Sequence, residues 1–170
     1  DTDRKHTLRL RRGRLDTITF HPKLGSLGAK TERLKSLSEQ IARSIDVNVE
    51  IVSQAAELSR CDLVSEMVLE FDELQGRVGT LYASLDGENP DVAHAIEGLY
   101  QPAGASDSIP DDLYGSILAL ADRMDTLAGL FAIGQPPTGS KDPFALRRAA
   151  IGLLRLNERS ELKLNLEPWL

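Results

Sequence analysis

The sequence predicts an all-α protein, built as a helical bundle, and three observations lead to this prediction. Hydrophobic residues make up 41% of the 170 residues but aromatic residues only 5%, so Leu, Ala, Ile and Val must build the interior. Apolar side chains recur at spacings of three and four residues, the period of an amphipathic helix. No segment sustains the every-second-residue alternation of a half-buried strand. This combination favours helices packed on helices.

Three helices are expected in the first half of the chain. The first covers residues 29–44, and Asp46 or Asn48 caps the second. The third follows a short turn after residue 58. Their apolar stripes are Leu34, Leu37 and Ile41 in the first helix; Val49, Val52, Ala55, Ala56 and Leu58 in the second; and Leu63, Met67, Phe71 and Leu74 in the third.

Three more helices are expected in the second half. The Asn-Pro pair at residues 89–90 starts one, because Asn caps a helix and proline is tolerated in the first turn. Residues 101–111 are a loop by composition, and an acidic cap, Asp111 or Asp112, starts a long apolar helix over residues 113–130. The Asp-Pro pair at residues 142–143 starts the last helix in the same way.

Cysteine content and hydropathy narrow the setting of the protein. The one cysteine, Cys61, cannot form an internal disulfide or a multi-cysteine zinc site, which fits a reduced, cytoplasmic location. No apolar run approaches the roughly 20 residues of a membrane span, and no signal peptide is visible, so we expect no membrane partner. Because the chain begins with Asp1, we expect it to be part of a longer protein.

Charge is unevenly distributed along the chain. Residues 1–35 hold ten Lys or Arg and four Asp or Glu, a net of +6, whereas residues 36–170 have a net of −12; the two give the overall −6. An acidic body excludes a generic nucleic-acid binder, but a basic segment can still contact phosphate locally. We therefore divide the chain into a basic arm or helix at 1–20, a helical domain at 21–157 and a tail at 158–170.

Three segments together resemble a metal site that has lost ligands. KTERLKSLSEQIA contains Lys30, SRCD contains Cys61 and Asp62, and LALADRMDTL contains Asp122. These segments are similar to those of HD-domain proteins. In those proteins an early histidine, a His-Asp pair and a later aspartate hold a metal. The resemblance implies an HD-domain-like helical bundle, in which Lys30 and Cys61 stand at the two histidine positions.

The residues at these positions are expected to hold the fold rather than a metal. A protonated lysine cannot bind a cation, so we expect Lys30 to form an internal ion pair with Asp62 or Asp122. Cys61 is expected to be a small buried hydrophobe. The alternative is a metal-dependent HD-type phosphohydrolase that uses Asp62 and Asp122.

Other ionisable groups are expected outside any site. Asp125 follows Asp122 by three residues and so projects from the same side of its helix, with Arg123 facing out. The histidines are interpreted as surface or interface residues, and three glutamates at helical spacing as a solvated face. These are His6, His21 and His94, and Glu66, Glu70 and Glu73.

Four longer stretches, in order, resemble the beta subunit of the bacterial heterotetrameric glycyl-tRNA synthetase. The most specific strings are MDTLAG and KDPFALRRA. The resemblance implies an internal fragment that contains the HD-like domain of that subunit, with a degenerate metal site. The stretches are TFHPKLGSLGAKTERL (19–34), SRCDLVSEMVLEFDELQG (59–76), LALADRMDTLAGLFAIG (118–134) and PTGSKDPFALRRAAIGLLRL (137–156).

The same resemblance implies what the chain does. The alpha subunit of such an enzyme activates glycine, and the whole enzyme uses ATP and Mg. This fragment would have no cofactor and no catalytic residue of its own. Its expected partners are the alpha subunit and tRNA-Gly, with a purely structural spacer as a further alternative. Basic side chains set RNA affinity through phosphate, and the candidates are Arg11, Arg12, Arg14, Lys141, Arg147, Arg148 and Arg155.

Overall fold

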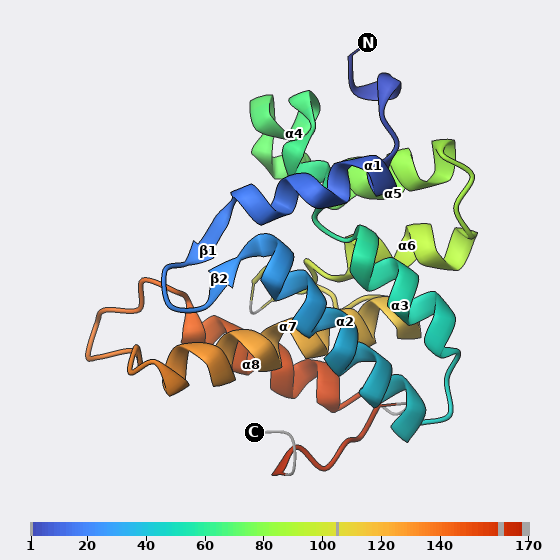
Figure 1. The fold of residues 1–170 in the computed structure, drawn as a ribbon. Coiled ribbons are helices and arrows are strands. Elements are labelled where there is room, and N and C mark those ends of the chain that lie inside the picture. The colour runs from blue at the N-terminus through green and yellow to red at the C-terminus, as the bar shows by residue number, and fades with distance from the viewer. Residues whose placement is uncertain (1, 105, 160–161, 168–170) are drawn as a thin grey trace.

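The computed structural model describes residues 2–104, 106–159 and 162–167 and is predominantly helical (Figure 1). This confirms the all-α prediction. A small antiparallel pair, β1 (Thr19–His21) and β2 (Gly25–Ser26), precedes the first long helix. These strands are too short to show an alternating pattern in the sequence, which is why they were not predicted.

The helices follow one another with short connections and pack into a bundle (Figure 1). The α-helices are α1 (Leu8–Arg11), α2 (Leu27–Ser44), α3 (Val49–Leu58), α4 (Glu66–Glu70), α5 (Arg77–Leu85), α6 (Pro90–Gly98), α7 (Leu113–Ala132) and α8 (Leu146–Asn157). Short 3-10 turns are η1 (Asp3–Lys5), η2 (Arg12–Thr17), η3 (Cys61–Val64) and η4 (Asp72–Leu74).

Side-chain caps start most of the long helices. Ser26, Asn48 and Asn89 accept hydrogen bonds from the first turns of α2, α3 and α6. Asp112, not Asp111, caps α7 through the Gly115 N–H. Each cap satisfies a backbone donor that the helix itself cannot pair, so these starts could be predicted from sequence.

The last helix starts later than the Asp-Pro pair predicts. Ala145 has a left-handed backbone (φ 53°) directly before α8, so the helix begins at Leu146. Asp142 still caps it, because its carboxylate accepts from the Leu146 and Arg147 N–H groups at 2.7 and 3.0 Å. Pro143 lies outside the helix.

The single helix expected over residues 63–74 is wrong. The segment divides into η3, α4 and η4, and two members of the expected stripe, Met67 and Phe71, are exposed. The division occurs at Ser65, whose backbone is extended (ψ 151°) and whose hydroxyl accepts from the Val68 N–H to start α4. Serine favours this role because its side chain replaces a backbone partner. The expected acidic stripe is divided as well, with Glu73 in η4.

The core lies among α2, α3, α6 and α7, with α8 packed along α7. Aliphatic residues fill it, as the low aromatic content requires. α6 and α7 approach closely at Gly98 and Gly115, where a Cβ on Gly98 would come within 2.6 Å of the Gly115 Cα. A side chain at Gly98 would therefore force the two helices apart.

The basic N-terminal segment is packed onto the bundle rather than projecting from it. Leu8 and Leu15 belong to the buried core, and so does Leu162 of the tail segment. The Asp3 carboxylate accepts from the Glu66 and Met67 N–H groups at 2.9 and 3.0 Å and pairs with Arg11. These contacts join residues 3–11 to α4, at the top of Figure 1.

Candidate functional site

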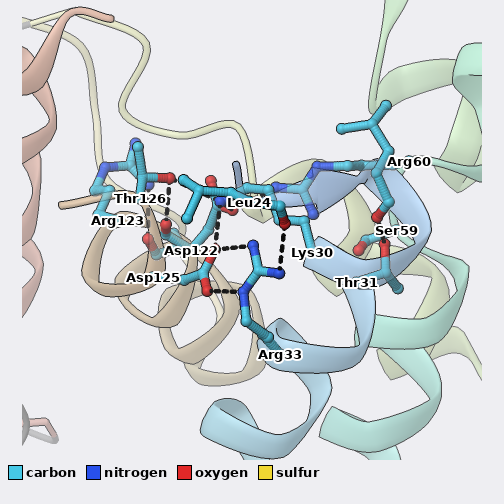
Figure 2. A network of polar contacts seen from close by, with 12 residues as sticks. Leu24, Lys30, Thr31, Arg33, Ser59, Arg60, Asp122, Arg123, Asp125 and Thr126 are labelled. Atoms are coloured by element: carbon cyan, nitrogen blue, oxygen red, sulfur yellow. Dashed lines mark hydrogen bonds and ion pairs between the residues drawn. The ribbon is translucent and has the colours of Figure 1, made fainter. Parts of the chain in front are cut away.

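The candidate site lies where α2 and α7 pack side by side, and Figure 2 shows its polar contacts. Lys30 on α2 places its Nζ 3.0 Å from Asp122 Oδ1 and 2.9 Å from Asp125 Oδ2 on α7. The Lys30 amine also donates to Thr126 Oγ1 at 2.7 Å, and its side chain is 4% exposed. The internal ion pair expected of Lys30 is therefore present, with Asp122 rather than Asp62.

Two arginines complete the network. Arg33 on α2 donates to both oxygens of Asp125, the closer at 2.6 Å, and to the Leu24 carbonyl. Arg60 donates from Nη2 to Asp122 Oδ1. Its side chain is only 7% exposed although it follows the end of α3, because a left-handed backbone (φ 71°) turns the chain there. Asp122 thus has two cationic partners from segments far apart in the sequence (Figure 2).

Asp122 is held in its charged form by these neighbours. Burial alone would raise its pKa, but the charges of Arg60 and Lys30 and their hydrogen bonds outweigh burial and lower it to about 2. The carboxylate is therefore ionised at any physiological pH. It acts as the counter-ion of two buried cations.

Asp62 has a different task. Its Oδ2 accepts from the N–H groups of Gly76 and Gly79 at 2.6 and 3.1 Å, which ties the turn after α3 to the start of α5. Burial raises the pKa of Asp62, and the two glycine N–H groups oppose that rise. The two aspartates that the sequence aligned with metal ligands are therefore both engaged by the fold.

The donor set does not fit a catalytic metal. Lys30 and Arg60 place positive charge on the Asp122 carboxylate, where a cation would have to bind. Burial raises the pKa of the Cys61 thiol to about 12, and its Sγ donates to the Glu57 carbonyl, so it is no thiolate at neutral pH. Metal binding requires deprotonated ligands. These positions instead form an internal polar network.

Three potential metal ligands do meet elsewhere in the described part of the chain. His94 Nε2 lies 2.8 Å from Asp111 Oδ1 and 3.7 Å from Asp112 Oδ2, close to the start of α7. The sequence did not bring His94 together with an acid. His94 and Asp111 are exposed, and such groups are common without an ion.

Comparison with known proteins agrees with the resemblance in the sequence. The family model described as "Glycyl-tRNA synthetase beta subunit" matches residues 1–170. The chain belongs to the glycyl-tRNA synthetase beta-subunit family. Curated members named "Glycine--tRNA ligase beta subunit" include one from Chromohalobacter salexigens, 52% identical over 170 residues, all of this chain and 25% of the relative.

Two further members of the family extend the comparison. The protein from Serratia proteamaculans is 48% identical over 167 residues, 98% of this chain and 24% of the relative. The protein from Neisseria meningitidis is 46% identical over 163 residues, 96% of this chain and 24% of the relative. The chain thus spans about a quarter of the length of the curated relatives it matches.

In this family member, the basic candidates of the N-terminal segment differ in availability. Arg11 is buried, donates to the Val64 carbonyl and pairs with Asp3 at 3.1 Å, so it does not face solvent and is withdrawn as an RNA contact. Arg12 pairs with Glu32 at 2.5 Å and donates to the Gly28 carbonyl. Arg14 is exposed and forms no ion pair within the described ranges.

The candidates near α8 are more open. Lys141, Arg147 and Arg148 are exposed and have no carboxylate within ion-pair distance in the part of the chain that the structure describes. Arg147 donates to the Gly139 carbonyl at 2.7 Å. Arg155 is half-buried and donates to the carbonyls of Gly104 and Asp107. The free charge on this side is therefore concentrated at residues 141–148.

Arg123 does not face out as expected. It is half-buried and donates to the carbonyls of Ala119 and Pro102, both at 2.8 Å. Gly152 on α8 leaves room for it, since a Cβ there would lie 2.6 Å from the Arg123 Nε. Helical spacing placed Asp122 and Asp125 on one side correctly, but the packing of α8 could not be inferred from spacing.

Arg60 is the functional-site residue that sequence reasoning missed. It lies directly before Cys61, in the turn that resembles the His-Asp turn of HD-domain proteins, and no periodic pattern distinguishes it. Its role depends on a left-handed backbone and on an aspartate 62 residues away.

Among the described residues, no helix is both long and apolar enough to cross a membrane.

Proposed function

We propose that this chain is a noncatalytic, HD-like helical part of a glycine–tRNA ligase beta subunit that contributes to tRNA-Gly binding and to subunit scaffolding. The observation that carries the proposal is the group of exposed, unpaired cations at Lys141, Arg147 and Arg148. Guanidinium and ammonium groups without protein counter-ions bind phosphates with release of salt ions. Membership of the glycyl-tRNA synthetase beta-subunit family supports tRNA as the RNA that these cations contact.

The noncatalytic part of the proposal rests on the interior network. Asp122 is neutralised by Lys30 and Arg60, and Asp62 holds backbone N–H groups, so neither is free to bind a metal or activate water. We extend the proposal to the whole ligase, in which the alpha subunit activates glycine with ATP and Mg. Cytoplasmic location and assembly into a heterotetramer belong to the same proposal.

The test is charge reversal on α8 in the full-length ligase. Arg147→Glu combined with Arg148→Glu should weaken tRNA-Gly binding about tenfold or more at 0.1 M salt and reduce the salt slope by about two. Binding is measured by titration at several salt concentrations. A matched control is Arg77→Glu, since Arg77 is 73% exposed but lies on α5.

The outcomes separate the alternatives. Unchanged affinity and unchanged salt slope in the α8 variant would remove these arginines as tRNA contacts and favour a structural spacer. An equal loss in the Arg77 control would indicate a general charge effect. Turnover of a phosphoester by the metal-loaded protein would support the alternative of an HD-type phosphohydrolase. The side chains at the degenerate metal positions argue against that alternative.

A further inference from the structure

A cavity of about 350 Å³ with a mixed polar and apolar lining lies between α7, α8 and the loop that follows α6. Its walls are distinct from the contacts that hold α2 and α7 together, apart from Asp122 and Thr126, which border both. The volume is at the lower end of small-ligand sites. The residues that matter for its chemistry are Tyr100, Asp122, Arg123, Thr126, Phe144 and Arg148.

Arg123 is the unusual member of this wall. A half-buried guanidinium normally has a carboxylate partner, because an unpaired charge is costly to bury. Arg123 has none among the described residues; its guanidinium donates instead to two neutral carbonyls, those of Ala119 and Pro102. Burial lowers its pKa, and the charge of Asp122 offsets part of that fall. The two carbonyls hold the guanidinium in place without forming an ion pair with it.

Arg148 on α8 is a second cation that lines the cavity. It is exposed on α8 and forms no hydrogen bond or ion pair within the described ranges. The cavity therefore has an arginine fixed on α7 and a free arginine on α8. Two such groups match the several oxygens of one phosphate, which arginine binds through paired hydrogen bonds.

The carboxylate of Asp122 does not cancel this charge. It belongs to a network in which the three cations Lys30, Arg33 and Arg60 already exceed the two carboxylates, Asp122 and Asp125. Arg60 also has a buried Nη1 with no hydrogen-bond partner in the described part of the chain, and the buried Tyr100 hydroxyl has none either. The surroundings of the cavity are thus net positive and contain polar groups left unpaired.

We propose that the cavity between α7 and α8 binds a phosphate group, held by Arg123 and Arg148. The bound group is the phosphate of a nucleotide, either free or within an RNA chain, and the aromatic ring of Phe144 at the edge of the cavity provides a surface for its base. Asp122, one of the degenerate metal positions, borders the site, which requires no metal.

The test uses the full-length ligase and inorganic phosphate as the first probe. Calorimetric titration should detect binding, and Arg148→Ala should weaken it about tenfold, the effect of losing a charged hydrogen bond. Arg77→Ala is the matched control, because Arg77 is an exposed arginine on α5 and does not line the cavity. Arg123→Gln should act in the same direction as Arg148→Ala, with thermal unfolding checking that each variant is folded.

The results decide the proposal and the source of the phosphate. Phosphate binding that is absent, or unchanged in the folded Arg148→Ala protein, overturns the proposal, as does an equal loss in Arg77→Ala. Competition between adenosine monophosphate and tRNA-Gly for the site would identify an RNA phosphate, and simultaneous binding would identify a free nucleotide. Failure here leaves the tRNA proposal testable, since that proposal is decided by tRNA affinity in the α8 double variant.

Discussion

Lys30 and Arg60 in the interior and Arg147 and Arg148 on α8 are all basic residues, yet their surroundings differ completely. The interior pair converges on one carboxylate and is almost fully buried. The α8 pair is exposed and has no carboxylate partner among the described residues. The comparison shows that positive charge in this chain has two uses: internal cations hold elements together, and the external ones remain available to a ligand.

The N-terminal segment extends the comparison. It carries much of the positive charge of the sequence, but the structure pairs Arg4 with Asp86 and Arg9 with Glu88, in addition to Arg11 with Asp3. The charges of the N-terminal segment therefore hold elements of the fold together, as the interior charges do, although several lie near the surface. Arg4, Arg9 and Arg11 thus serve docking of this segment. Lys30 and Arg33, which also lie within residues 1–35, belong instead to the network between α2 and α7.

The largest expected effect comes from breaking the interior network. Asp122→Asn should destabilise the fold by about 3–5 kcal/mol, because it leaves Arg60 buried without an ion-pair partner and removes one of the two carboxylates that pair with Lys30. Denaturant unfolding of the variant measures this. Asp16→Asn is the control, since Asp16 forms an ion pair at 3.7 Å but is 65% exposed, and it should change stability by less than 1 kcal/mol. Equal losses of stability in Asp122→Asn and Asp16→Asn would contradict the distinction between buried and exposed charges.

A smaller loss is expected where the N-terminal segment docks. Asp3→Asn should cost about 2–3 kcal/mol, since the carboxylate accepts charged hydrogen bonds from α4 and pairs with Arg11. Hydrogen exchange should show earlier opening of residues 3–11 and α4 than of α7. If α7 opens equally early, the segment does not act as a separate docked unit.

Acid should reveal the charge on Asp122. The folded pKa of about 2 lies below the ordinary value, so its contribution of about 2 kcal/mol is present above pH 4 and is lost as pH falls from 4 to 2. Unfolding free energy measured across this range should fall more steeply in the natural protein than in Asp122→Asn. If the unfolding free energies of the two proteins fall in parallel with pH, carboxylates other than Asp122 cause the acid destabilisation.

The smallest expected effect is at a partly exposed pair. Glu88→Gln removes the partner of Arg9, whose side chain is 48% exposed, and should cost less than 1 kcal/mol. The loss should shrink further in high salt, because exposed ion pairs are screened. A salt-independent loss of several kcal/mol would place this pair with the interior charges instead.

Much of the helical framework could be predicted from the sequence, and the failures have clear causes. The stripes and caps of α2, α3, α6 and α7 are local signals that lie within one or two turns of each helix. Residues 63–74 were predicted to form one helix, but apolar residues at helical spacing are also compatible with short turns. The extended backbone at Ser65 decided against the continuous helix.

The candidate site was predicted in part. The resemblance placed Lys30 and Asp122 in one site, and the structure pairs them. Asp62 was expected in the same site, but it binds the backbone at Gly76 and Gly79 instead. No local pattern could reveal the roles of Arg60 and Arg123, since each depends on partners supplied by other elements.

The sequence by itself determined the helical class, the position of most helices and the family, because periodicity, caps and long specific strings are properties of neighbouring residues. Only the tertiary structure decided which charges are paired. Lys30 and Arg60 meet Asp122 across 92 and 62 positions of chain, whereas Arg148 meets no carboxylate in the part of the chain described. Electrostatic pairing depends on distance in space and on burial, and the order of residues specifies neither directly.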